Sequence, residues 1–167
     1  MDKSLKDNIL NICNVLNKHS VQYLIVGGVA VALHGYFRIS TDSSGLPADK
    51  HDLDFWYNPT YDNYFALLNA LAELGQDVEK FQKERVPNPA KSFFKLDFEK
   101  FTLDFIPELK GLTNFRSSFK NREIVIFDEI EISYMGYEDL IKEKEINPRP
   151  KDVDDIEQLK FRRNKTN

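Results

Sequence analysis

The sequence predicts an α/β (α+β) fold in which a mixed β-sheet is flanked by helices, with further helices at the C-terminal end. Three observations lead to this prediction. Segments with helical spacing of apolar residues alternate with short β-rich segments along the 167 residues. Thirteen Phe and seven Tyr residues favour the packing of a sheet over that of a helical bundle. No linker or repeat divides the sequence, so we expect one domain over residues 1–167, with its core at about 20–135 and a helical part at about 136–163.

The first half of the chain is predicted to form three helices and two strands. Apolar residues recur at three- and four-residue spacing over 5–18 and 61–74, as in amphipathic helices. Short β-rich runs occupy 21–26 and 51–57. The apolar segment 29–35 ends at a glycine, which is typical of the C-terminal end of a short helix.

The second half is predicted to form two β-hairpins followed by two helices. Two polar residues separate the β-rich runs 92–98 and 101–106, and two more separate 123–127 and 130–135, a spacing typical of hairpins. The polar segment 111–122 between the hairpins is expected to form a loop. Helical patterns follow the second hairpin, and prolines between them mark a break.

Charge and cysteine content exclude several classes of protein. The formal net charge of -4 argues against a protein that coats nucleic acid non-specifically, although an enzyme that meets nucleic acid at one patch stays open. Cys13 is the only cysteine, which excludes an internal disulfide and a cysteine-rich zinc site. The sequence has no apolar run of signal-peptide or membrane-spanning type, so we expect a cytoplasmic protein without a membrane partner.

The segment His51–Tyr57 places two carboxylates two positions apart inside an apolar run. In a strand, Asp52, Asp54 and Trp56 share one face, while the residues between them face a core. Two neighbouring acids repel each other, and burial adds a desolvation cost. A bound divalent cation relieves both effects, so the pattern predicts a metal site. The alternative is an exposed edge strand with ordinary alternation.

Two further features accompany this pair of acids. The strand at 21–26 ends in Gly27-Gly28 before a predicted helix, and the free N–H groups of a helix N-terminus bind phosphate. A plain tight turn is the commoner explanation of such a glycine pair when it stands alone. Asp104 lies between two large apolar residues in a β-rich run, as Asp54 does, and Asp97 on the preceding strand is a rival for the same role.

Together these features resemble the nucleotidyltransferase superfamily with the polymerase-β-like palm. Its motif is an apolar residue followed by two small residues, then two acids alternating with apolar residues, then a third carboxylate. Val26–Gly28, Asp52–Phe55 and Asp104 match this pattern. The runs 27–38 and 149–159 resemble the small bacterial branch of the superfamily, which is related to abortive-infection toxins.

The resemblance implies a transfer of a nucleoside monophosphate from a nucleoside triphosphate (NTP) to a hydroxyl group. Asp52, Asp54 and Asp104 would be the catalytic residues and would hold one or two Mg²⁺ ions. Asp104 would also help to deprotonate the acceptor hydroxyl. Gly27 and Gly28 would leave room for the triphosphate.

Three cations are candidates for nucleotide binding, namely Arg38, Lys50 and Lys151. For Arg38 and Lys50, solvation is an equally good explanation, and Lys151 is favoured by the Lys-Asp-x-x-Asp pattern that begins there. Lys142 and Lys144, in the predicted charged helix 137–145, could also reach phosphate, but lysines in a helical charge run are usually solvated, which is the expectation here. The usual family spacing of about a dozen residues from the glycines reaches Asp42, whereas the paired acids begin at Asp52, which indicates an insertion at 43–50.

The sequence leaves the acceptor open. RNA, a protein and a small molecule such as an antibiotic are all compatible with the resemblance, and a toxin would have a cognate antitoxin as partner. A different class is a non-catalytic nucleotide-binding or protein-interaction module that keeps the palm fold, because fold similarity alone does not establish activity. The base preference, the number of metal ions and the oligomeric state do not follow from the sequence.

Overall fold

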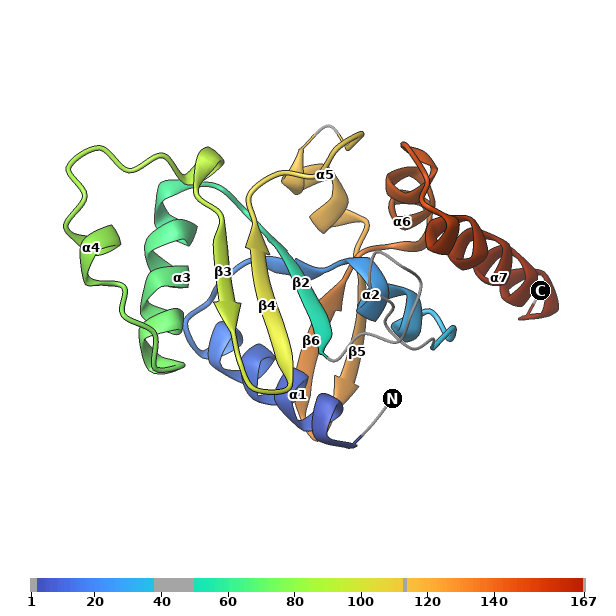
Figure 1. Cartoon of the computed structure of the whole chain (residues 1–167), viewed down its shortest axis with the longest axis horizontal. Helices are drawn as coiled ribbons and strands as arrows, with labels where there is room; N and C mark the ends of the chain where they lie inside the picture. Colours follow the sequence, from blue (N-terminus) through green and yellow to red (C-terminus); the bar gives the residue numbers. More distant parts are fainter. Residues whose placement is uncertain (1–2, 38–49, 113, 167) are drawn as a thin grey trace.

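The structure, a computed structural model, describes residues 3–37, 50–112 and 114–166. In this part of the chain a six-stranded mixed sheet has helices on both faces (Figure 1). This arrangement confirms the predicted α/β (α+β) class. The strands are β1 (Tyr23–Ile25), β2 (His51–Tyr57), β3 (Phe94–Asp97), β4 (Phe101–Ile106), β5 (Glu123–Phe127) and β6 (Ile130–Tyr134).

The helices match the predicted order and add short elements to it. Those that were predicted are α1 (Lys3–Lys18), α2 (Gly27–Leu33), α3 (Tyr61–Glu73), α6 (Tyr137–Glu145) and α7 (Pro150–Thr166). Those that were not predicted are α4 (Glu79–Gln82), α5 (Phe115–Lys120) and the 3-10 turn η1 (Pro89–Lys91). No helix within the described ranges is long and apolar enough to cross a membrane.

Strand β2 lies inside the sheet, whose order is β3-β4-β2-β1-β6-β5. It pairs antiparallel with β1 and parallel with β4, and β1 pairs parallel with β6. The edge strands β3 and β5 belong to the two predicted hairpins. The parallel register of β2 and β4 places Asp54 directly opposite Asp104.

One face of the sheet is a closed apolar core under α1 and α3. From β2 it takes Leu53, Phe55 and Tyr57, each no more than 1% exposed. The Tyr57 hydroxyl donates to the carbonyl oxygen of Pro89 at 2.7 Å, which satisfies the polar end of a buried ring. The Thr60 side chain caps the N-terminus of α3 by accepting from the backbone N–H of Asn63.

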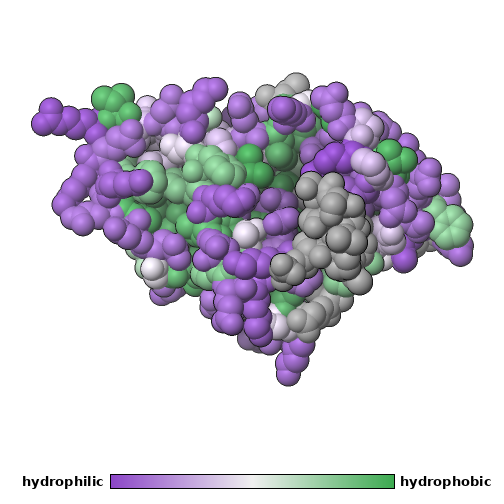
Figure 2. Space-filling view, viewed as in Figure 1, coloured by the Kyte–Doolittle hydropathy of each residue, from purple (hydrophilic) through white to green (hydrophobic). Residues whose placement is uncertain are grey.

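The other face is covered only in part, by α2 and by α5, α6 and α7. Trp56 is buried there against Phe115 at a ring distance of 5.3 Å, and its indole N–H donates to the carbonyl oxygen of Pro107. Figure 2 shows the middle of this face hollowed, with hydrophobic side chains beside hydrophilic ones. Alternation along β2 therefore gives a packed end at Trp56 and an open region at the two acids.

The expected loop at 111–122 contains a helix, so that prediction was wrong. The Asn114 side chain accepts from the backbone N–H of Ser117 and so caps α5. Phe115 and Phe119 then lie four residues apart on one helical face and stack at 5.2 Å. The sequence indicated these two phenylalanines as possible anchors of the segment, but its polar composition concealed the helix.

Candidate active site

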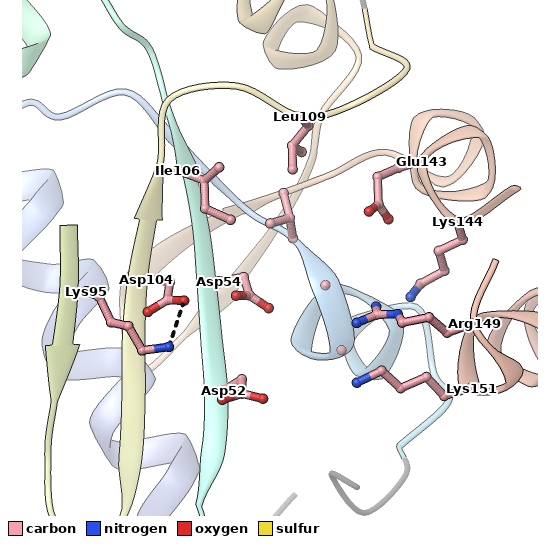
Figure 3. A pocket seen from close by; sticks show the side chains of 13 residues that line it. Asp52, Asp54, Lys95, Asp104, Ile106, Leu109, Glu143, Lys144, Arg149 and Lys151 are labelled. Carbon is pink, nitrogen blue, oxygen red and sulfur yellow. Dashed lines mark ion pairs between the residues drawn. The ribbon is translucent and has the colours of Figure 1, made fainter. Parts of the chain in front are cut away.

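Asp52, Asp54 and Asp104 lie together on the open face of the sheet (Figure 3). Alternation places the first two on the same side of β2, and the parallel register brings Asp104 of β4 beside Asp54. The Asp52 carboxylate accepts from the Thr102 hydroxyl at 2.7 Å, across the same pair of strands. We call these three side chains the acid row.

Asp97, the rival of Asp104, lies elsewhere. Its register partner on β4 is Thr102, its side chain is 72% exposed, and it forms an ion pair of 2.6 Å with Lys50. Lys50 therefore points to the edge strand and does not line the pocket above the acid row. Arg38, Asp42 and residues 43–49 of the proposed insertion lie outside the described residues.

Asp54 has the least favourable charge environment of the acid row. Burial raises its pKa to about 6, and the negative charges of Asp104 and Asp52 act in the same direction. Glu143 adds to this shift, and the positive charge of Lys151 opposes it. The ionised carboxylate is therefore short of compensating positive charge in this environment.

Asp104 is also short of compensating partners, as the surroundings of its two carboxylate oxygens show. Its Oδ1 is buried without a hydrogen-bond partner within the described structure, while its Oδ2 lies 3.7 Å from the Lys95 ammonium. Burial raises the pKa of Asp104, and Lys95 opposes this shift. A buried carboxylate oxygen without a partner is costly, and a ligand that meets it would remove the cost.

Gly27 is required by the acid row itself. Its φ of +62° is in the left-handed region, and a Cβ there would lie well inside 3.0 Å of Asp54 Oδ2. The backbone N–H of Val26 also donates to the Asp54 carbonyl oxygen at 2.9 Å. Gly27 was expected to leave space for a triphosphate, which stays a prediction, and the structure adds that it leaves space for Asp54. Gly28 follows it and lines the pocket.

A pocket of about 330 Å³ opens over the acid row. Gly27, Gly28 and the three acids line one side, and Lys151 lines the opposite side together with Glu143, Lys144 and Arg149. Figure 3 shows Arg149 and Lys151 extending from the α6–α7 region toward the acids, and we call these two side chains the basic wall. The remaining lining residues are Val26, Lys95, Ile106 and Leu109.

Lys144 corrects one sequence-based expectation. It was expected to be solvated, yet its side chain is 2% exposed and pairs with Asp152 at 3.2 Å and Asp155 at 2.8 Å. The sequence contains the two partners of Lys144, Asp152 and Asp155, three residues apart in the segment that forms α7. Which lysine those acids would meet depends on the packing of α6 against α7, which a sequence pattern does not give.

Glu143 is a fourth carboxylate at the pocket, across from the acid row in Figure 3. Burial raises its pKa, while the neighbouring Lys144 and Arg149 oppose the shift. The pocket thus combines acids and bases on facing walls, an arrangement suited to an anion bound together with a cation.

The fold is similar to that of solved structures of nucleotidyltransferases. Antibiotic-resistance factor ANT(2'')-Ia, in its solution structure, aligns with a TM-score of 0.56 and 16% identity over 95% of this chain and 84% of its own. An inferred nucleotidyltransferase from Thermotoga maritima aligns with a TM-score of 0.53 and 17% identity over 99% and 96%. Lincosamide antibiotic adenylyltransferase LnuA, bound to lincomycin, aligns with a TM-score of 0.53 and 15% identity over 96% of this chain and 97% of its own.

Comparison of sequences adds no family assignment. No protein-family model matches the chain, and no curated protein matches it. At these low identities the structural likeness establishes the fold, so the activity has to be argued from the site.

The acid row suits a hard divalent cation by its chemistry. Carboxylate oxygens are the preferred ligands of Mg²⁺, and the unpartnered Oδ1 of Asp104 and the high pKa of Asp54 both indicate missing positive charge. Within the described residues, no three His, Cys, Asp or Glu side chains are already gathered closely enough to hold an ion. Binding would therefore need adjustment of these side chains.

Proposed function

We propose that the protein is a Mg²⁺-dependent nucleotidyltransferase that moves a nucleoside monophosphate from an NTP to a hydroxyl group. The observation that carries this proposal is the acid row facing a basic wall across one pocket. A triphosphate with its metal ion needs both walls, because carboxylates bind the metal and cations bind the phosphate oxygens. The shared fold of the antibiotic adenylyltransferase LnuA supports the same reaction class.

The chain would supply the groups for an in-line displacement. Asp52, Asp54 and Asp104 would hold one or two Mg²⁺ ions, which would neutralise charge on the α-phosphate and on the leaving group. The acceptor oxygen forms a bond to the α-phosphorus, the bond from that phosphorus to the bridging oxygen breaks, and pyrophosphate leaves. Asp104 Oδ1, a buried acceptor that no described residue contacts by a hydrogen bond, would take the acceptor proton.

The nucleotide would lie between the two walls. Lys151 would contact its phosphates, since it lines the pocket opposite the acids. Gly28 would border the same space. The proposal gives Lys50 no role, because Lys50 pairs with Asp97. Contact of Arg38 with the nucleotide stays a prediction from the sequence, since Arg38 lies outside the described residues.

Of the three possible acceptors, RNA, a protein and a small molecule, the small molecule is the best supported. ANT(2'')-Ia is an antibiotic-resistance factor and LnuA holds lincomycin, and both align over nearly the whole of this chain. We therefore propose an antibiotic or a similar hydroxyl-bearing small molecule. Transfer onto RNA or a protein by a toxin with a cognate antitoxin rests only on the resemblance of 27–38 and 149–159 to that branch.

The test is transfer of radioactive label from α-³²P-labelled NTPs in the presence of Mg²⁺. Each of the four NTPs would be offered with a panel of antibiotics, tRNA and protein, so that base and acceptor are identified together. We expect wild-type protein to label one acceptor and Asp54→Ala to lose at least about a hundredfold in rate, as for loss of a metal ligand or its support. Transfer by Asp54→Ala at the wild-type rate would refute the mechanism. Calorimetry that shows NTP binding without any transfer would instead support the non-catalytic module.

A further inference from the structure

A buried ionic cluster joins α6 to α7 next to Arg149 of the basic wall. Lys144 from α6 contacts Asp152 and Asp155 from α7, and all three side chains are no more than 7% exposed. Buried charges of this kind are costly unless each one is paired. Asp152 has a further partner that is not buried, and this partner is Arg149.

Arg149 is held by Asp152 through one edge of its guanidinium group. Its Nε donates to Asp152 Oδ2 at 2.7 Å, and its Nη2 donates to Oδ1 at 3.1 Å. The backbone N–H of Arg149 also donates to Oδ2, at 3.0 Å. Burial disfavours the charge of Asp152, yet the hydrogen bonds from Arg149 and Lys144 hold its pKa well below its usual range.

This geometry leaves the outer edge of the guanidinium group available for a ligand. A guanidinium group has five N–H donors, and the two used by Asp152 belong to its Nε side. The remaining edge carries N–H groups of both Nη atoms, the arrangement that binds phosphate with two parallel hydrogen bonds. The side chain is 64% exposed and extends into the pocket toward the acid row (Figure 3).

Arg149 faces the acids without touching them. Among the described residues its ion pair is with Asp152, and it forms none with the acid row, although Asp54 contributes to its electrostatic environment. An arginine held at a distance from carboxylates leaves a gap that an anion can fill on one side and a metal ion on the other. A polyphosphate with bound Mg²⁺ has this distribution of charge.

We propose that Arg149 binds the pyrophosphate end of the NTP, and that Asp152 is a positioning residue that aims Arg149 at it. This inference rests on the proposed function, and it assigns roles to two residues for which the sequence gave no role in nucleotide binding. The competing explanation is structural. Asp152 lies in the first turn of α7 and accepts from the backbone N–H of Arg149, so it also acts as a helix cap.

The test uses inorganic tripolyphosphate, which has no base and therefore does not depend on the unknown base preference. Its dissociation constant would be measured by calorimetry on the full chain in the presence of Mg²⁺. We expect Arg149→Gln to weaken binding roughly tenfold to a hundredfold, as for loss of charge-assisted hydrogen bonds. Arg149→Lys should lose a smaller factor, because it keeps the charge and loses the two-pronged geometry.

Arg163 provides a matched control. It is also an arginine of α7 and also forms an ion pair, in this case with Glu138 of α6 at 2.7 Å, but it does not line the pocket. Arg163→Gln should change the dissociation constant by less than about twofold, as expected for a surface ion pair away from the ligand. An equal loss in Arg163→Gln and Arg149→Gln would overturn the proposal, because the effect would then come from helix packing or net charge.

A double-mutant cycle separates positioning from capping. If Asp152 acts through Arg149, Asp152→Asn weakens tripolyphosphate binding severalfold in the wild-type background and has no further effect once Arg149 is replaced by Gln. Loss of the cap would instead lower the melting temperature in both backgrounds by the same amount. Equal weakening of binding in both backgrounds would overturn the positioning role of Asp152.

The outcomes also distinguish this inference from the proposed function. If wild-type protein transfers labelled nucleotide but Arg149→Gln binds tripolyphosphate as wild type does, the assignment of Arg149 fails while the function stands. The assignment fails in the same way if the wild type transfers nucleotide but does not bind tripolyphosphate. If the wild type neither transfers nucleotide nor binds tripolyphosphate, both fail.

Discussion

The two faces of strand β2 differ in almost every respect although they belong to the same short segment. Leu53, Phe55 and Tyr57 are sealed under α1 and α3, whereas Asp52 and Asp54 border an open pocket. The first face lowers the free energy of the fold by burying apolar surface. The second face raises it, because acids lie side by side with little compensating charge. The stability gained on one face thus permits an unfavourable charge arrangement on the other.

The largest expected effect comes from the closed face. Phe55 is 1% exposed and contacts the rings of Tyr23 and Phe105 at 5.5 and 5.3 Å. Phe55→Ala should lower the free energy of unfolding by about 3–5 kcal/mol, because it removes buried area and leaves a cavity. Urea unfolding followed by circular dichroism measures this change. A loss below about 1 kcal/mol would mean that this face is not the stabilising core.

The second largest expected effect is a gain in the free energy of unfolding, and it comes from the open face, where the charge of Asp54 is unfavourable. The pKa of Asp54 is raised in the folded protein, to about 6 from 3.8, so the folded state holds the proton more tightly than the unfolded state. The cost to stability is therefore absent below about pH 4, grows between about pH 4 and 6, and is complete above about pH 6. At one pKa unit per 1.36 kcal/mol it amounts to about 3 kcal/mol.

Asp54→Asn removes this cost because the amide is neutral at every pH. Without divalent cations, we expect the variant to be more stable than the wild type at about pH 8, with the two converging near about pH 4. Urea midpoints measured across this range test the prediction. A variant that is less stable than the wild type at the alkaline end would contradict it.

The third effect measures how closely the two neighbours Gly27 and Asp54 fit. Gly27→Ala should cost roughly 1–3 kcal/mol, because it combines a positive φ with a clash against Asp54 Oδ2. Gly75 is a matched control, since its φ is +85° and a methyl group there would meet no atom of the described residues within 4 Å. Gly75→Ala should therefore show only the conformational cost of about 1 kcal/mol. Equal losses in the two thermal melts would show that the clash with Asp54 is unimportant.

The sequence predicted the acid row well because it depends on local alternation. Asp52 and Asp54 share a face in any strand, and Asp104 needed only one parallel pairing to join them. Of the basic wall, Lys151 was a candidate from the sequence and Arg149 was not, because the placement of Arg149 depends on how α6 meets α7. Lys144 resembled a solvated helix residue, and Arg149 resembled a residue in a proline-flanked connection. Their roles appear only when Asp152 is seen to contact both.

Gly27 illustrates a third case, in which the structure adds a reason for the residue that the sequence did not indicate. The sequence indicated that a small residue follows β1, and the expected neighbour was a triphosphate. The neighbour in the structure is Asp54, which belongs to the next strand along the chain and is brought close by the antiparallel pairing of β1 with β2. Long-range register of this kind is set by tertiary packing and cannot be inferred from the local pattern.

The central claim is that the open face is kept short of positive charge so that it can bind a divalent cation. Thermal unfolding at about pH 8, with and without excess Mg²⁺, tests it most directly for the wild type and Asp54→Asn. We predict that Mg²⁺ raises the melting temperature of the wild type, because a ligand bound only to the folded state stabilises it, and that Mg²⁺ has little effect on the variant. An equal rise in both proteins, or no rise in the wild type, would contradict the claim.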